Sequence, residues 1–252
     1  MSIAMESGHW YTPSGQPCHT VLSAKGAERN TTLRDARKMN LSPSVTSVIK
    51  VMAAPGLERW KREQSMLAAL TLPKNDGESE YMWFKRVRED AMEQAKEAAE
   101  EGTRIHGAIE RHFSDQTVTR EYEPFTRGVE HALHESCGEQ EWSTERTFTS
   151  NFGYGGCMDL HSKEWVVDFK GKEFSAGDDL KTYDEHHMQL AAYRRGLGSY
   201  CRRAAIVFVS RNEPGLCQFH EIEEEDLERG WAMFFSCLTL WMAQKRYAPE
   251  AT

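Results

Sequence analysis

The stretch that decides the fold is Gly156-Cys-Met-Asp-Leu-His-Ser-Lys-Glu-Trp-Val-Val-Asp-Phe-Lys170. Residues 158–160 and 165–169 are short apolar runs on either side of a polar segment, and the second run is rich in β-branched and aromatic side chains. This pattern predicts two strands joined by a turn at residues 161–164. We therefore expect a β-hairpin at the centre of the protein.

The hairpin brings acidic side chains together. A turn at 161–164 pairs Asp159 with Val166 and Cys157 with Asp168, so the two aspartates become diagonal neighbours on one face. Lys170 points to the same face because side chains alternate along a strand. Carboxylates about 4 Å apart repel by several kcal/mol at an effective dielectric near 20, so their convergence favours a divalent cation beside the lysine.

An ordinary surface hairpin is the alternative, because an Asp-x-Lys triplet is common by chance. The apolar run Trp165-Val-Val before Asp168 weighs against it. Such a run indicates a strand that is buried on both faces, where an unpaired charge is costly.

The segments around the hairpin predict an α/β protein with a mixed sheet. The residues before 42 favour loops with one short hairpin, and 144–148 alternates before a turn at 153–156. We predict helices from 42, from 55, over 80–113 (with an interruption open at Gly102), over 184–197 and over 224–246, and further strands at 204–209 and 218–222. As domains we predict N-terminal loops and helices over 1–100, packed on the core, and a core with a C-terminal helix over 101–252.

Composition and charge exclude several classes of protein. The chain has 252 residues, of which 39% are hydrophobic and 28% charged, so it is neither disordered nor fibrous. It contains no apolar run long enough to span a membrane and no signal-peptide pattern, so we expect neither export nor membrane insertion. The six cysteines are far apart, and we expect reduced thiols.

The net charge of −8 gives no general attraction to nucleic acid. One local basic segment exists, because residues 181–211 hold six basic residues against two acidic ones, a balance of +4. Affinity for DNA should therefore be modest and sensitive to salt.

Two helices offer further candidate residues. His106 and Glu110 are four residues apart and share a helix face, as do Gln189 and Tyr193. Each pair also has a structural interpretation: a partly buried histidine bonded to a glutamate, and a core tyrosine with its hydroxyl satisfied.

Taken together, these pieces resemble the RecB-like exonuclease branch of the PD-(D/E)XK nuclease superfamily, with its phage-type and mitochondrial members. The resemblance covers about residues 102–209 and rests on four segments in order. These are Gly102-Thr-x-x-His106, Gly156-x-x-Asp159, Asp168-x-Lys170 and Gln189-x-x-x-Tyr193. It implies a restriction-endonuclease-like core: a central sheet flanked by helices, with a helical N-terminal addition.

The resemblance also implies roles for individual residues. His106, Asp159, Asp168 and the carbonyl of Phe169 would bind the metal, and Glu110 is an additional acid. Asp159, Asp168, Lys170, Gln189 and Tyr193 form the implied catalytic set, in which Lys170 orients or helps deprotonate the attacking water. Arg194, Arg195, Arg202 and Arg203 are candidate phosphate contacts, with a solvated helix end as the alternative for Arg194 and Arg195. The cysteine spacing of relatives that hold an iron–sulfur cluster is not reproduced, so we predict no cluster.

Oxygen ligands with one imidazole suit Mg²⁺ or Mn²⁺. We therefore expect a metal-dependent deoxyribonuclease that acts as an exonuclease on DNA ends or single strands, in phage or bacterial recombination, replication or repair. The expected location is the cytoplasm of a bacterium or a phage-infected host. The expected partners are DNA and a recombination or replication protein, with oligomer formation left open. A structure-specific or nicking endonuclease is the alternative, and a catalytically inactive DNA-end or partner-binding module is the alternative of another class.

Overall fold

A computed structural model describes residues 9–52, 55–196, 198 and 203–250. The chain divides into two compact units, and each is described here by itself. The first unit, called the core below, contains the chain up to Met52 and from Ala108 onward. The second, called the hairpin unit, contains Ala53–Gly107. The division differs from the expected boundary near residue 100, because Trp10, Val45 and Val48 are buried in the same hydrophobic cluster as the C-terminal helix.

The predicted helices and strands are present in the predicted order, and two helices are added to them. The elements are β1 (Trp10–Tyr11), β2 (Thr20–Leu22), β3 (Glu28–Asn30), α1 (Leu33–Met39), β4 (Ser42–Pro43), α2 (Val45–Ile49), α3 (Pro55–Thr71), α4 (Glu80–Phe113), α5 (Glu123–Cys137), β5 (Ser143–Ser150), β6 (Tyr154–His161), β7 (Trp165–Lys172), α6 (Asp184–Gly196), β8 (Arg203–Ser210), β9 (Cys217–Ile222) and α7 (Glu224–Lys245). Helix α4 runs through Gly102 without interruption. The additions are α1 and α5, in segments where we predicted no helix.

A mixed sheet of five strands in the order β5-β6-β7-β8-β9 forms the centre of the core. Only β7 and β8 are parallel, and α6 connects them. The first five residues of β7, Trp165–Phe169, are all buried, as expected for a central strand. The prediction of an α/β protein with a mixed sheet and flanking helices is confirmed.

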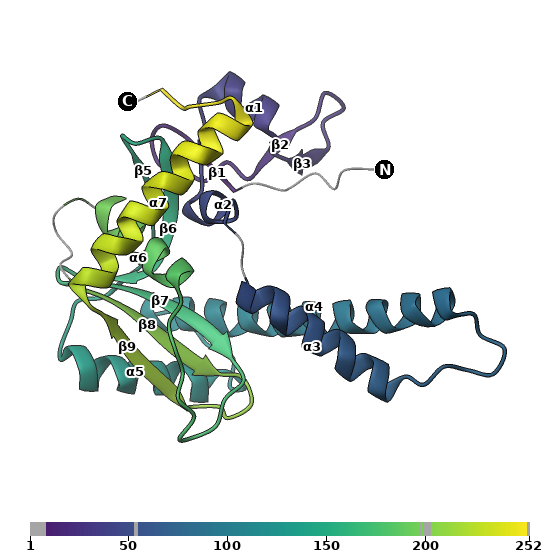
Figure 1. Cartoon of the computed structure of the whole chain (residues 1–252). Helices are drawn as coiled ribbons and strands as arrows, with labels where there is room; N and C mark the ends of the chain where they lie inside the picture. The colour runs from purple at the N-terminus through teal and green to yellow at the C-terminus, as the bar shows by residue number, and fades with distance from the viewer. Residues whose placement is uncertain (1–8, 53–54, 197, 199–202, 251–252) are drawn as a thin grey trace. The chain divides into compact units, whose positions relative to one another are not determined.

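Helices cover the sheet in layers (Figure 1). Helix α6 packs against β5, β6, β7 and β8, and α7 packs against α6, while α5 contacts β8 and β9. Gly230 allows the close approach of α7, because a Cβ at this position would lie 2.7 Å from the backbone of His187.

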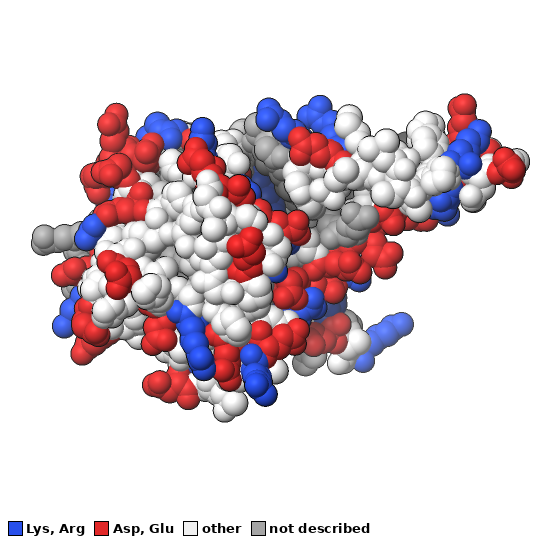
Figure 2. Space-filling view, turned by 90° about the horizontal axis from the view of Figure 1, so that it is seen from below, with Lys and Arg blue, Asp and Glu red and all other residues white. Residues whose placement is uncertain are grey.

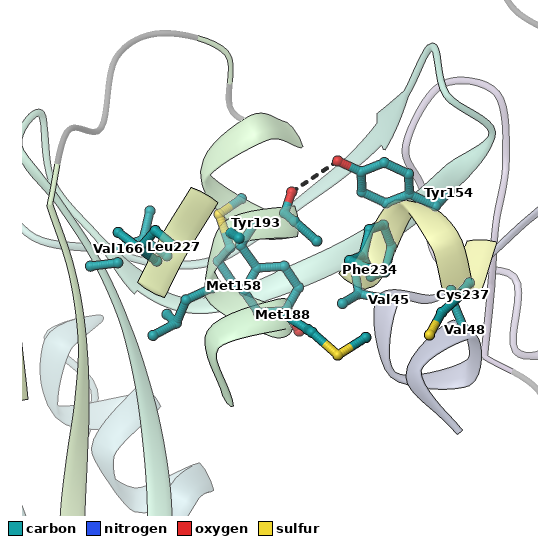
Figure 3. Packing of buried hydrophobic residues seen from close by; sticks show 14 of the residues in the cluster. Val45, Val48, Tyr154, Met158, Val166, Met188, Tyr193, Leu227, Phe234 and Cys237 are labelled. Atoms are coloured by element: carbon teal, nitrogen blue, oxygen red, sulfur yellow. Dashed lines mark hydrogen bonds between the residues drawn. The ribbon is translucent and has the colours of Figure 1, made fainter. Parts of the chain in front are cut away.

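The main hydrophobic cluster fills the space between α2, α6, α7 and the sheet (Figure 3). The ring of Tyr154 lies 4.8 Å from that of Phe234, and its hydroxyl donates to the carbonyl of Ala192 at 3.0 Å. This cluster holds α6 on the sheet, which matters because α6 carries two of the candidate catalytic residues, Gln189 and Tyr193.

The register of the central hairpin differs from the expected one by two residues. His161 pairs with Val166 and Leu160 pairs with Val167. The turn is shorter than we expected, because Ser162 and Trp165 already close the hairpin through a backbone hydrogen bond of 2.9 Å. The Ser162 hydroxyl accepts from the amides of Glu164 and Trp165, both at 3.2 Å, and so stabilises the tight turn.

The glycine-rich segment 153–156 also differs from its prediction as a turn. Gly153 does turn, with φ +83°, but the next three residues already belong to β6 rather than to the turn. The missed helix α1 begins with a capping box between Thr32 and Asp35, a signal that is visible in the sequence.

The hairpin unit consists of α3 and most of α4, joined by residues 72–79. Ala68, Val87 and Ala91 form its small hydrophobic cluster. The connection is held by Trp83, whose indole donates to the carbonyl of Leu72 at 2.7 Å, and by an ion pair of Arg86 with Glu78 at 2.8 Å.

Within the described residues, no helix has the length and apolar character that crossing a membrane requires. Basic side chains lie scattered among acidic ones on the face shown in Figure 2, as the net charge of −8 suggests. The five cysteines in the described part of the chain are free thiols, and Cys201 lies outside it.

Candidate metal-dependent active site

Four of the predicted catalytic side chains form one hydrogen-bonded network in the core. The Lys170 ammonium lies 2.7 Å from Asp168 Oδ2 and donates to Gln189 Oε1 at 3.1 Å. The Gln189 amide nitrogen donates to Asp168 Oδ1 at 2.6 Å and contacts the Tyr193 hydroxyl at 3.0 Å. Both carboxylate oxygens of Asp168 are therefore held by neighbouring side chains.

Strand β7 and helix α6 position this network. Asp168 and Lys170 are two residues apart on β7 and so share a face, and Gln189 and Tyr193 are one helical turn apart on α6. Asp168, Gln189 and Tyr193 are buried, with Asp168 only 1% exposed, whereas Lys170 is half-buried. The Asp168-x-Lys170 and Gln189-x-x-x-Tyr193 segments are thus in direct contact.

The charges of the network stabilise each other. Burial acts to lower the pKa of Lys170, but the carboxylates of Asp168 and Asp159 outweigh it and raise this pKa above its ordinary value. Burial also raises the pKa of Tyr193, and the same two carboxylates add to the effect. Lys170 is therefore a cation, and Tyr193 a neutral hydroxyl, at neutral pH.

Asp159 lies beside this network, in the place where β6 and β7 separate. The ladder between the two strands consists of the pairs formed by Leu160 and His161, and it ends before Asp159. Asp159 Oδ2 instead accepts a hydrogen bond of 3.0 Å from the backbone amide of Phe169. The carboxylate thus takes the place of a backbone hydrogen bond between the strands. The same contact places the backbone of Phe169, whose carbonyl the resemblance implies as a metal ligand, next to Asp159.

Glu145 is a candidate that sequence reasoning missed. Thr144 pairs with Leu160 and Arg146 with Met158, so Glu145 lies opposite Asp159, and yet this pair is absent from the ladder. Glu145 has φ +48°, a left-handed conformation that is uncommon for a residue other than glycine and costs about 1–3 kcal/mol.

The Glu145 and Asp159 carboxylates each offer one oxygen for a metal, and these two oxygens lie within 4.8 Å of each other. The signal for Glu145 was available in the sequence: a turn centred on residue 152 places it opposite Asp159.

Glu145 is exposed and has a thiol as a hydrogen-bond donor. The Cys157 thiol donates to Glu145 Oε2 at 2.8 Å. Burial raises the pKa of Cys157, with further contributions from Glu145, Asp159 and Glu110, so this group is a neutral donor. Glu110, the additional acid of the prediction, lies half-buried on α4 within the core.

The donor types fit a divalent cation. Within the core, the candidate set consists of the carboxylates of Glu145 and Asp159, and the resemblance implies His106 as an imidazole ligand. Hard oxygen ligands with one imidazole suit Mg²⁺ and Mn²⁺. His106 belongs to the hairpin unit, one residue before its end, and is half-buried.

The candidate DNA-binding arginines already have acidic partners. Arg194 lies 2.5 Å from Glu224, and Arg195 lies 3.1 Å from Glu228. Arg203 pairs with Glu221. Arg202 lies outside the described residues. The acidic segment that follows the basic one therefore offsets its charge in space as well as in sequence.

Comparisons with known proteins give no family by sequence. No family model matches the chain, and no curated protein matches it. Among solved structures the chain is similar to one named "Putative exonuclease" from Eubacterium rectale, at 11% identity and a TM-score of 0.42, covering 58% of this chain and 68% of that one. It is also similar to the structure of SSO0001, at 20% identity and a TM-score of 0.28, covering 48% of this chain and 57% of that one.

These identities and TM-scores are too low to assign a family. The class of protein is therefore described from the fold and the site of this chain. It is an α/β protein whose mixed five-stranded sheet carries a buried aspartate paired with a half-buried lysine, beside two carboxylates that fit a divalent metal.

Proposed function

We propose that this protein is a metal-dependent nuclease of the RecB-like kind, an exonuclease that hydrolyses phosphodiester bonds at DNA ends or in single strands. The observation that carries the proposal is the contact of Asp168, Lys170, Gln189 and Tyr193 in one network next to Asp159. Three motifs that are separate in the sequence converge there, which a surface hairpin with incidental charges would not require. By the resemblance, the activity belongs to phage or bacterial recombination, replication or repair.

The metal would be held by Asp159 and Glu145, with Asp168 and the Phe169 carbonyl as further oxygens; His106 is the imidazole ligand that the resemblance implies. A bound Mg²⁺ or Mn²⁺ lowers the pKa of water and offsets the negative charge that develops on a phosphodiester during in-line attack.

The residues of the chain have separate tasks. Lys170 places a positive charge where the attacking water and the phosphate meet, and Asp168 and Gln189 fix its ammonium group in position. The Gln189 amide holds Asp168 on one side and Tyr193 on the other, so α6 keeps the network in one geometry. Because Lys170 is cationic, orientation of the water suits it better than removal of a proton.

The test compares end-labelled linear single-stranded and double-stranded DNA with a closed circle, in Mg²⁺, Mn²⁺ or EDTA. Lys170→Ala is the informative variant, and Lys163→Ala, exposed in the turn of the same hairpin, is the matched control. Metal-dependent loss of linear DNA alone, abolished by Lys170→Ala and kept by Lys163→Ala, would support the exonuclease. Cutting of the circle would favour the endonuclease, and DNA binding without cutting would favour the inactive binding module.

The metal site has a test of its own. Glu145→Gln should weaken Mn²⁺ binding at least tenfold in titration calorimetry, because it removes one of two converging carboxylates. Glu141→Gln, exposed just before β5, is the control and should bind Mn²⁺ like the unaltered protein. Equal affinity of all three proteins would exclude Glu145 as a ligand.

A further inference from the structure

Helix α7 has an unusual outer face. Between Arg229 and Lys245 the helix carries no charged side chain. Its inner side is buried in the main hydrophobic cluster. Its outer side is exposed and consists of small and apolar residues: Ala232, Phe235, Ser236, Thr239, Leu240 and Ala243. A helix that is apolar all round is normally buried on all sides, so this face lacks a partner within the core.

The few polar atoms on this face are already satisfied. The Ser236 hydroxyl donates to the carbonyl of Ala232 at 2.9 Å, and the Thr239 hydroxyl donates to that of Phe235 at 3.0 Å. Both side chains therefore present little free hydrogen-bonding capacity to a partner.

A residue from the β5–β6 turn extends this surface. The Phe152 ring lies 5.7 Å from that of Phe235. Phe152 is 50% exposed, Phe235 44% and Leu240 47%. Three large apolar side chains thus lie half in solvent on this surface of the core.

We propose that the outer face of α7 binds the same face of a second copy of this chain, with the two helices antiparallel. The charges at the helix ends support this arrangement. The first turn is acidic, with Glu225 exposed, and the last turn is basic, with Lys245 followed by Arg246. In an antiparallel pair each acidic end lies beside the partner's basic end, and the helix dipoles oppose each other.

The midpoint between Glu225 and Arg246 falls between Phe235 and Ser236. The two-fold axis would therefore pass near these residues, with each Phe235 ring lying over the small Ser236 of the other copy. Small residues near an axis allow helices to approach closely, at about 8–10 Å.

The same charges disfavour a nucleic acid as the occupant. Glu224, Glu225 and Glu228 border the face at one end and would repel phosphates. The dimer should be weak, since α7 has 22 residues and offers a strip about 33 Å long and about 10 Å wide. This is smaller than the roughly 800 Å² per partner of stable complexes.

Sedimentation velocity of the full chain over a range from about 1 to 200 µM tests the proposal. The unaltered protein should shift from monomer to dimer as its concentration rises. Leu240→Glu should raise the dissociation constant at least tenfold, whereas Leu22→Glu, at an exposed leucine on β2, should leave it unchanged. A thermal melt of both variants checks that they fold.

The orientation of the helices has a separate test. Glu225→Lys should weaken the dimer, and the double variant Glu225→Lys with Arg246→Glu should restore it. Ser236→Cys should form a covalent dimer under oxidation, and Ala24→Cys, exposed in the β2–β3 turn, should not. A chain that stays monomeric over the whole range, or a dimer that Leu240→Glu does not weaken, would overturn the proposal.

Discussion

Replacement of Lys170 by methionine should destabilise the protein substantially, whatever its effect on activity. Met keeps much of the aliphatic chain but removes the ammonium that lies 2.7 Å from Asp168. The Gln189 amide still donates to Asp168, whose side chain is 2% exposed. Removal of one partner of a buried ion pair costs about 3–5 kcal/mol.

The solvent exposure of Lys170 and Asp168 determines how much folding stability the variant loses. The Lys170 side chain is 31% exposed, so water can reach the space that the ammonium leaves, and we expect the lower end of that range, about 3 kcal/mol. For a chain of about this size such a loss lowers the melting temperature by roughly 6–12 °C. Asp168→Asn should cost less, because the ammonium left behind is the more exposed partner.

A double-mutant cycle measures the interaction. Melting followed by circular dichroism is compared for the unaltered protein, Lys170→Met, Asp168→Asn and the double variant. The double variant should be more stable than the sum of the two single effects by at least about 1 kcal/mol, because no buried charge remains. A fall of less than about 2 °C for Lys170→Met, or strict additivity, would refute the argument.

Three further outcomes follow from the structure. Gly156→Ala should reduce activity and lower the melting temperature, because a Cβ there would lie 2.8 Å from the Tyr193 ring; normal activity and melting would contradict this contact. Replacing both acidic partners of Arg194, in the double variant Glu224→Gln with Glu228→Gln, should strengthen DNA binding in a salt titration, because they compete with phosphate for Arg194, and an unchanged affinity would exclude Arg194 as a contact. Burial, with a smaller effect of Lys170, lowers the pKa of His186 to about 3, so the folded protein keeps it neutral while the unfolded chain protonates it below about 6.5. Its contribution to stability is thus lost as pH falls from about 6.5 to 3, at up to about 1.4 kcal/mol per pH unit, and His186→Gln should flatten this fall in urea unfolding at pH 6.5, 5.5 and 4.5. Parallel pH profiles of the two proteins would show that His186 is not responsible.

The sequence by itself determined the strands, the long helices and most of the catalytic candidates. The apolar run Trp165-Val-Val predicted a buried central strand, and the structure confirms it. The spacing of Gln189 and Tyr193 predicted one helix face, and both side chains do contact each other. These features depend on the periodicity of strands and helices, which neighbouring residues fix locally.

Only the tertiary structure decided how the residues of the site are arranged relative to one another. The register of the hairpin depends on how Ser162 caps its tight turn, and we expected a longer turn. The left-handed conformation of Glu145 opposite Asp159 depends on packing between strands, because the backbone of an isolated glutamate would avoid it.

The pairing of Arg194 and Arg195 with acids on α7 likewise joins residues about thirty positions apart. A local pattern in the sequence carries the period of a strand or helix, but contacts between distant segments depend on the free energy of the whole fold. That difference is why the candidate residues were predictable and their arrangement was not.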